Sequence, residues 1–236
     1  MKKSELPAGL ATAFDPQALQ PVNQQVYLVL RRAIVRCVLL PGILLSEKDV
    51  SSLFGVSRQP VREALIKLGE AGLVRVLPQR GSYVSKVSLR QIREGRFIRD
   101  AVETAIVRKA AELVQPRQMA ALELNIQQQE RAVAQRDFAG FLDLDDVFHA
   151  TLAAAVDCPR AWQFLENIKS HMDRVRYLTL GDISSLDVLL RQHAGVLAAL
   201  RLRDAEAAAA AMHVHLRELQ TTLEQVSRLH PDWFEL

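Results

Sequence analysis

The spacing of apolar and polar positions divides the chain near residue 87. Before that point, apolar residues recur at helical spacing in three successive segments and then alternate as they do in a strand. Beyond it, helical spacing continues almost to the end of the chain. The pattern therefore predicts a mostly α protein, with three helices and a β-hairpin over 21–87 and an all-α helical bundle over 88–236. Residues 1–20 have no such pattern, and we expect a flexible N-terminal tail there.

Local signals place the first two helices. An apolar stripe opposite several arginines predicts a helix over 24–38, and Pro41-Gly42 turns the chain after it. Ser46 can cap a second helix, which runs to about Phe54. Gly55 then ends that helix, because glycine tolerates a positive φ.

The third helix and the hairpin follow directly. Ser57 is expected to cap the helix, Pro60 is tolerated in its first turn, and Gly72 ends it. Two short strands, 73–77 and 82–85, then flank a turn-rich loop. Three helices followed by a hairpin is the order of elements in a winged helix-turn-helix.

In a helix-turn-helix, the N-terminus of the second helix of the pair faces the base edges of the DNA major groove. Here it carries Arg58, Gln59 and, one turn later, Arg62. Arginine can bind guanine and glutamine can bind adenine through two hydrogen bonds each. Ser57 and the free N–H groups of the first turn suit a phosphate. The segment is therefore predicted to read DNA.

The surroundings of this helix favour the same interpretation. Lys48 on the preceding helix and Gln79-Arg80 at the tip of the hairpin lie where contacts to the DNA backbone or minor groove would form. Residues 1–86 hold twelve Lys/Arg against six Asp/Glu, a net charge of +6, whereas the rest of the chain is at −3. The alternative is an ordinary pair of helices with solvated faces used for protein contacts.

Composition limits the class of protein. Apolar residues make up 49% and charged residues 24%, as in a globular protein with a core. Cys37 and Cys158 are too few for a disulfide framework and lack metal-site spacing, so we expect two small buried residues in a reducing compartment. No apolar run reaches the ~18 residues of a membrane span. We expect a cytoplasmic protein that does not associate with a membrane.

The back half is predicted to contain six or seven helices packed as a bundle. Helical stretches are interrupted near Pro116, Asp137, Pro159 and Gly181, and again at Arg203-Asp204. No strand-like alternation persists beyond residue 88.

Four residues of the back half are candidates for a metal site. Asp145 and His149 are four residues apart, so both project from one face of one helix. His193 and His215, each on a later helix, could complete the site. Three imidazoles and one carboxylate suit Zn, Ni, Mn or Fe better than Ca or Mg. The alternative is that these are ordinary surface groups or core groups with partners of their own.

The front of the chain resembles a known family. Pro41 to Glu47, Phe54 to Leu65, Leu68 to Val74, and Arg80-Gly81 are similar to the N-terminal domain of GntR-type bacterial transcription regulators. The resemblance covers residues 24–86. It implies a homodimer that binds a short palindrome in double-stranded operator DNA.

Taken with the residue-level argument, the resemblance gives a set of expected DNA contacts. In the family, the positions of Lys48, Arg58, Gln59 and Arg62 contact operator DNA, and Arg80-Gly81 lies in the wing. The full expected set is Lys48, Ser57, Arg58, Gln59, Arg62, Gln79, Arg80 and Gly81.

The back half is similar to the FadR-type subgroup of these regulators, which has an all-helical FCD effector domain. The resemblance spans residues 88–225 and rests on Arg99 to Glu103, Asp145 to His149, His193 to Leu197 and Met212 to Leu216. It implies that the metal ligands are Asp145, His149, His193 and His215.

The sequence departs from the subgroup in two places. Asp157-Cys158-Pro159 stands where Gly-Asn-Pro is usual, and Gln192 stands where glutamate is common. Neither change removes a ligand, but both could alter the cavity or the support of the ligands.

Arg99 matches an arginine that faces the effector cavity in similar proteins. Arg174 or Arg176 could add a second positive group, and an arginine beside a metal suits a small carboxylate. The alternative is a surface salt bridge with Glu103 or Asp173.

Two further histidines are expected outside the site. His171 is expected to be partly exposed, although a part in the site stays open. His213 lies two residues before His215, hence on roughly the opposite helix face, and is expected to be solvated.

The pattern and the resemblance together favour a bacterial transcription regulator, expected to be a repressor. A small organic acid beside a divalent metal would control its operator binding. One alternative is a regulator whose metal site is structural or empty. Another is a metal-dependent enzyme, since three His and one Asp can leave coordination positions open; no separate base or nucleophile is evident near the ligands, and we expect no enzymatic activity. The operator, the effector, the metal and the sign of regulation are left open by the sequence.

Overall fold

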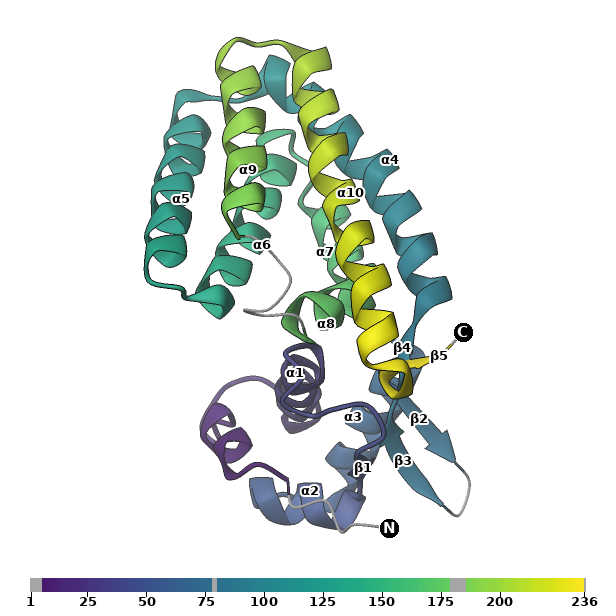
Figure 1. Ribbon diagram of the computed structural model, residues 1–236. Coiled ribbons are helices and arrows are strands. Elements are labelled where there is room, and N and C mark those ends of the chain that lie inside the picture. Colours follow the sequence, from purple (N-terminus) through teal and green to yellow (C-terminus); the bar gives the residue numbers. More distant parts are fainter. Residues whose placement is uncertain (1–5, 78–79, 179–185, 236) are drawn as a thin grey trace. The chain divides into compact units, whose positions relative to one another are not determined.

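The computed structural model describes residues 6–77, 80–178 and 186–235. The chain forms two compact units (Figure 1). The first consists of Met1–Leu89, Asp173–Leu178 and His230–Leu236, and the second of Arg90–Met172 and Thr179–Leu229. Two late segments therefore join the first unit, which the predicted linear boundary at residue 87 did not include.

The first unit contains the predicted three helices and hairpin, so the fold class of its N-terminal part is confirmed. Its helices are α1 (Val22–Val35), α2 (Glu47–Phe54) and α3 (Arg58–Glu70), and its sheet contains β1 (Leu44–Leu45), β2 (Val74–Leu77) and β3 (Gly81–Val84). The strands are antiparallel in the order β1-β3-β2, and Val74 pairs with Val84 while Leu77 pairs with Gly81. Strand β1 was not predicted, because two residues are too short to show alternation.

The signals predicted at the ends of α2 are confirmed. The Ser46 hydroxyl accepts a hydrogen bond from the Asp49 N–H at 3.4 Å. Gly55 has a φ of 66° and directs the chain out of α2 in the left-handed conformation. Ser57 occupies the N-cap position of α3, but its side chain makes no cap hydrogen bond, so its predicted capping role is wrong. Ser57 is exposed at the surface instead.

Part of the predicted N-terminal tail belongs to the core. Ala8–Ala13 form a 3-10 helix, η1, and Leu10 and Phe14 are buried beside α1 and α2. The Phe14 and Phe54 rings lie 5.2 Å apart between centroids. The expectation of a flexible tail is therefore wrong from Ala8 onward: two apolar side chains without periodicity still anchor the segment.

The C-terminal end adds one more pairing to the first unit. Strand β4 (Val87–Ser88) pairs in parallel with β5 (Phe234–Glu235), which follows the short helix η2 (Pro231–Trp233). The sequence did not predict it, because a two-residue parallel pairing depends on a contact between distant segments.

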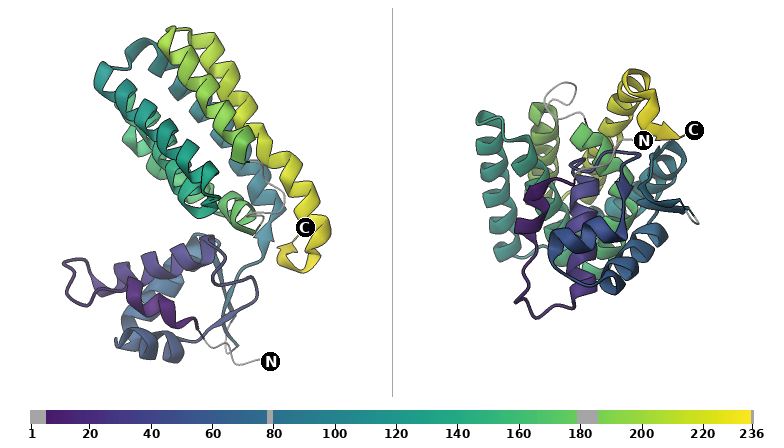
Figure 2. Two further views of the ribbon diagram at one scale, coloured as in Figure 1. Left: turned by 60° about the vertical axis from the view of Figure 1, so that its left-hand side comes forward. Right: turned by 90° about the horizontal axis from the view of Figure 1, so that it is seen from below.

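The second unit is helical throughout its described residues, as predicted. Including α8, which begins there, the described part of 88–236 contains α4 (Leu89–Leu113), α5 (Pro116–Ala134), α6 (Phe138–Ala155), α7 (Pro159–Ile168), α8 (Ser170–Leu178), α9 (Leu186–Arg201) and α10 (Ala205–Leu229). Helix α9 lies between α10 and α5, and α5 packs on α6 (Figure 2). Side chains such as Phe148, Leu152 and Leu200 fill the core between these helices.

The predicted helix breaks are present where they can be observed. Pro116 and Pro159 begin α5 and α7, and Asp137 caps α6 by accepting from the Gly140 N–H at 2.9 Å. Asp204 accepts from the Ala207 N–H at 2.9 Å at the start of α10. The predicted break at Gly181 lies outside the described residues.

The turn that departs from the FCD pattern keeps the geometry a glycine would provide. Asp157 has a φ of 55°, in the left-handed region. Aspartate tolerates that region better than most side chains do, so the change from glycine is accommodated there. The neighbouring Cys158 is exposed and Cys37 is half-buried, which corrects the expectation of two buried cysteines.

Within the described residues, no helix is both long enough and apolar enough to cross a membrane.

Candidate metal centre and nucleic-acid interface

The structure brings the four predicted metal ligands together in the second unit. Asp145 and His149 project from α6, His193 from α9 and His215 from α10. Each residue is at most 3% exposed, and one ligand atom from each lies within 4.8 Å of the others. Among the described residues, this is the group of His, Cys, Asp and Glu that could hold a metal ion, and His171 is not part of it.

Most of the distances between these ligand atoms are close to those found around one metal ion. His149 Nε2 and His193 Nε2 lie 3.1 and 3.3 Å from His215 Nε2. Asp145 Oδ1 is 3.4 Å from His193 Nε2 and 4.0 Å from His215 Nε2. Atoms bound about 2.0–2.1 Å from one metal are separated by roughly 2.9–3.4 Å in tetrahedral or octahedral geometry. Three of the four separations are in or at the edge of that range.

Each of the three histidines meets an outer side chain at Nδ1. His193 Nδ1 lies 2.8 Å from Gln129 Oε1, and His215 Nδ1 lies 3.3 Å from Gln192 Oε1. Carbonyl oxygens accept hydrogen bonds, so these contacts place the proton of each ring on Nδ1. The Nε2 atom of each ring then carries a lone pair that can bind a cation.

A carboxylate takes the corresponding place for His149. Its Nδ1 contacts Glu103 Oε2, a close polar contact rather than an aligned hydrogen bond. The other oxygen of Glu103 accepts from Arg99 Nε at 2.5 Å. Burial alone would raise the pKa of Glu103, but the charge of Arg99 and the polar contacts with Arg99 and His149 outweigh it and lower the pKa to about 2. Glu103 is therefore a carboxylate at neutral pH.

The donor set fits a divalent transition metal. Lone pairs from three neutral imidazoles and one carboxylate converge in a buried space, where they would repel one another without a cation. Nitrogen-rich sets of this kind suit Zn, Ni, Mn or Fe.

Of the three predicted effector-binding arginines, the structure groups one with the metal ligands. Arg99 is buried beside Glu103, so the alternative salt bridge is present, although in the core rather than at the surface. Arg174 and Arg176 lie in the part of α8 that belongs to the first unit. There, the fully buried Arg174 donates from Nη2 to the Ser85 carbonyl at 2.7 Å.

Two histidines outside the ligand group, His171 and His213, differ from expectation to unequal degrees. His171 is 2% exposed, so the expectation of partial exposure is wrong. His213 is half-exposed and its Nδ1 lies 2.6 Å from Asp100 Oδ1. It is thus solvated in part, with a carboxylate partner.

Sequence reasoning named Glu103 only as a possible partner of Arg99 and Gln192 only as a departure from the subgroup, and it missed Asn125 and Gln129. Glu103 is four residues after Arg99, and Gln129 is four after Asn125, so each pair shares a helix face. That spacing could have shown the pair of Asn125 and Gln129 as well. It could not have shown which histidine each pair faces, because Gln129 and His193 are 64 residues apart.

The predicted DNA-contacting residues of α2 and α3 are exposed in the first unit. These are Lys48, Ser57, Arg58, Gln59 and Arg62. Arg80 and Gly81 are also exposed at the hairpin, whereas Gln79 lies outside the described residues. The N-terminus of α3 thus presents polar side chains and its first N–H groups on one surface.

Two of these side chains are held by carboxylates. Arg62 donates from Nε and Nη2 to the two oxygens of Glu47 at 2.8 and 2.9 Å. Gln59 donates to Glu63 Oε1 at 3.1 Å. The hydrogen bond from Arg62 lowers the pKa of Glu47. Both contacts are at the surface, where such pairs exchange for other partners at little cost.

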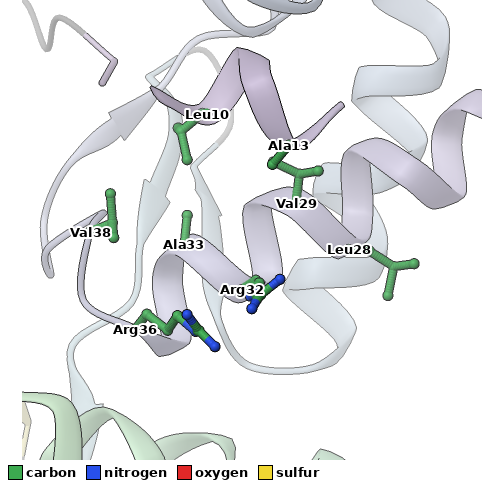
Figure 3. A pocket seen from close by; sticks show the side chains of 8 residues that line it. All are labelled: Leu10, Ala13, Leu28, Val29, Arg32, Ala33, Arg36 and Val38. Carbon is green, nitrogen blue, oxygen red and sulfur yellow. The ribbon is translucent and has the colours of Figure 1, made fainter. Parts of the chain in front are cut away.

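The first unit also has an apolar hollow of about 280 Å³ between η1 and α1 (Figure 3). Arg32 and Arg36 are the charged residues in its lining. It includes none of the residues to which the sequence assigned a role.

Comparisons with known proteins cover both units. Residues 22–84 match the family described as "Bacterial regulatory proteins, gntR family", and residues 96–218 match the FCD domain. The chain is 48% identical over 215 residues to the HTH-type transcriptional repressor RspR of Escherichia coli (strain K12), covering 91% of this chain and 94% of that protein.

Solved structures share the fold. E. coli McbR/YncC aligns with a TM-score of 0.77 at 23% identity, over 88% of this chain and all (100%) of that one. A putative transcriptional regulator GntR from Rhodococcus sp. RHA1 aligns with a TM-score of 0.72 at 25% identity, over 86% of this chain and 97% of that one.

Proposed function

Because the chain belongs to the GntR family of bacterial transcription regulators and carries an FCD domain, we propose that it represses transcription under the control of a small carboxylate. The carboxylate would bind beside a divalent metal in the second unit and change the affinity of the first unit for operator DNA. The convergence of three histidine Nε2 atoms and one carboxylate in the core of the FCD domain carries this proposal.

The α3 N-terminus would bind the operator. Arg58 and Gln59 are exposed there, and both can make two hydrogen bonds to a purine in the major groove. Arg62 would exchange its contact with Glu47 for DNA. Since bacterial DNA is in the cytoplasm, we propose that the protein acts there.

The substitution Arg58→Ala tests the proposal that the N-terminus of α3 binds the operator. Binding sites would first be selected from random duplex DNA by the wild-type protein, and affinities for the selected site would then be measured by fluorescence anisotropy. Loss of a base contact costs about 1–3 kcal/mol, hence roughly 5- to 150-fold in affinity. Lys67→Ala, which removes a positive charge at the exposed far end of α3, is the matched control and should cost far less. Equal losses in both variants would contradict the assignment.

The metal is proposed to bind through Asp145, His149, His193 and His215. A metal there would supply a positive charge and an open coordination position for an anion. Elemental analysis of purified protein should find about one Zn, Ni, Mn or Fe per chain, and His193→Ala should lose it. A metal that raises the melting temperature but leaves every ligand response unchanged would indicate a purely structural site.

The carboxylate is proposed to bind at Arg99. In the described structure Arg99 pairs with Glu103, and Glu103 in turn contacts the ligand His149. An anion that binds Arg99 would compete with Glu103 for its guanidinium, so it would act on the support of His149 as well. This continuous series of contacts is a physical route from the effector to the metal.

A homodimer would present two α3 helices to a palindromic site. The second unit has an apolar face that suits a second copy of this chain. Phe97 on α4 and Phe164 on α7 are 77% and 58% exposed, and a groove of about 470 Å³ lies between Ala105 of α4 and Ala161 of α7. We expect light scattering to give a dimer mass, and Phe97→Glu to shift it toward a monomer. A monomeric wild-type protein would contradict this part of the proposal.

A further inference from the structure

We infer that Gln129, held by Asn125, is a positioning residue of the proposed metal centre. Both residues are on α5, a helix that contributes no ligand. The inference rests on the proposed metal site, and it specifies how this chain fixes the orientation and tautomer of His193.

The orientation of each amide in this series follows from its neighbour. The Leu144 carbonyl can only accept, so the Asn125 side chain must direct Nδ2 toward it, at 3.0 Å. Asn125 Oδ1 then faces Gln129 Nε2 and accepts from it at 2.7 Å. Gln129 is thereby left with Oε1 facing His193 Nδ1 at 2.8 Å.

This orientation determines the tautomer of His193. An amide oxygen cannot donate, so the ring must carry its proton on Nδ1. Its Nε2 lone pair then points toward Asp145 and His215. Phe148 stacks on the same ring with centroids 4.5 Å apart, which limits rotation of the ring. Gln129 and His193 are completely buried, so water does not replace these contacts.

The series also connects two ligand-bearing helices. It begins at the carbonyl of Leu144, the residue before the ligand Asp145 on α6, and it ends on His193 of α9. A displacement of α5 would therefore affect the contact beside Asp145 and the contact to His193 together. Outer contacts of this kind typically change metal affinity by about 10- to 100-fold when they are removed.

A parallel arrangement holds His215. Glu218 Oε2 accepts from Gln192 Nε2 at 3.1 Å, which turns Gln192 Oε1 toward His215 Nδ1. Here glutamine stands where the family commonly has glutamate, and an amide oxygen still accepts from the ring. Glutamine at position 192 therefore favours the same tautomer of His215 as glutamate would, although it lacks the negative charge.

The first test uses the wild-type protein without metal. Nitrogen-15 NMR of the histidine side chains at pH 8 distinguishes a ring protonated at Nδ1 from one protonated at Nε2. We expect the Nδ1–H form for His193, assigned by comparison with His193→Ala. The Nε2–H form would overturn the inference, and this result does not depend on whether a metal binds.

The second test measures zinc affinity by competition with a chromophoric chelator. Gln129→Met should weaken zinc binding about 10- to 100-fold and give a mixture of His193 tautomers. Gln128→Met, one residue earlier on the exposed face of α5, is the matched control and should bind zinc as the wild type does. An affinity within threefold of the control would overturn the inference.

If Gln129→Met does not fold, Asn125→Ala replaces it, because Asn125 contacts Gln129 and not the ring. It should weaken zinc binding by less than Gln129→Met would, yet measurably, and broaden the His193 signal. Unchanged zinc affinity and an unchanged His193 signal in Asn125→Ala would overturn the inferred role of Asn125 in holding Gln129. Wild-type protein that binds no zinc but has the Nδ1–H tautomer would contradict the proposed metal site while leaving the positioning of His193 intact.

Discussion

At the scale of single residues, identical side chains differ because of what surrounds them. The three histidines that converge near Asp145 are buried, whereas His213, whose Nδ1 also faces a carboxylate, is half-exposed on the same helix as His215. Arginines differ as well: Arg62 pairs with an exposed carboxylate, while Arg99 pairs with a buried one. Removing one partner of a buried pair destabilises the protein strongly, whereas removing one partner of an exposed pair changes its stability little.

The two cysteines should react at different rates. Burial raises the pKa of the Cys37 thiol to about 11, so only about one molecule in a thousand carries the reactive thiolate at pH 8. Cys158 is exposed. We expect one thiol, that of Cys158, to react rapidly with iodoacetamide at pH 8. Mass spectrometry of the labelled protein measures this reaction. Cys158→Ser should remove that reaction, and labelling of Cys37 should rise with pH up to about 11. Rapid labelling of folded Cys158→Ser protein at pH 8 would contradict this.

At the scale of elements, local signals were sufficient for the helices and the hairpin. Gly55, Pro116 and Asp137 mark ends that depend on the backbone of a few adjacent residues. Strand β1, the pairing of β4 with β5, and η1 were not predicted. They depend on contacts between distant segments, and their sequences are too short for a period. The same limit applies to the site: four-residue spacing joined Asp145 to His149, but nothing local linked Gln129 to His193.

Two glycines provide a matched test of backbone conformation. A Cβ at either Gly55 or Gly195 would meet no atom within 4 Å, so packing contributes nothing to the stability change of either variant. Gly55 has a φ of 66°, and Gly55→Ala should lower the free energy of unfolding by about 1–2 kcal/mol. Gly195 is an exposed residue inside α9, and Gly195→Ala should raise it by roughly 0.5–1 kcal/mol. Urea denaturation of both variants checks the signs; changes of the same sign would show that the conformation of α2's end is misassigned.

At the scale of the whole molecule, the chain combines a DNA-binding unit with a helical unit that has a buried cluster of possible metal ligands. The resemblance of the sequence to its family was the source of the complete ligand set, because residue spacing alone left His193 and His215 as candidates. The family and the fold are confirmed by the comparisons. Arg174 and Arg176, in contrast, belong to the first unit, which helical spacing around them could not indicate.

Coupling between the two units has a definite energetic requirement. A ligand alters operator affinity only if it binds the two arrangements of the protein with different affinities, and such couplings are typically about 1–3 kcal/mol, or 5- to 150-fold. If the carboxylate binds a position opened by the metal, removal of the metal must remove its effect on DNA as well.

The most direct test is therefore the operator affinity of the full chain during titration with small carboxylates, with and without metal. Fluorescence anisotropy on a selected site would be measured for zinc-loaded protein, for chelator-treated protein and for His193→Ala, across mono- and dicarboxylates of increasing length. We predict that at least one carboxylate lowers the affinity of the zinc-loaded protein by roughly tenfold. The same compound should leave the other two samples unchanged. An equal response without metal, or an operator affinity that no carboxylate changes, would contradict control of DNA binding from the metal-bearing pocket.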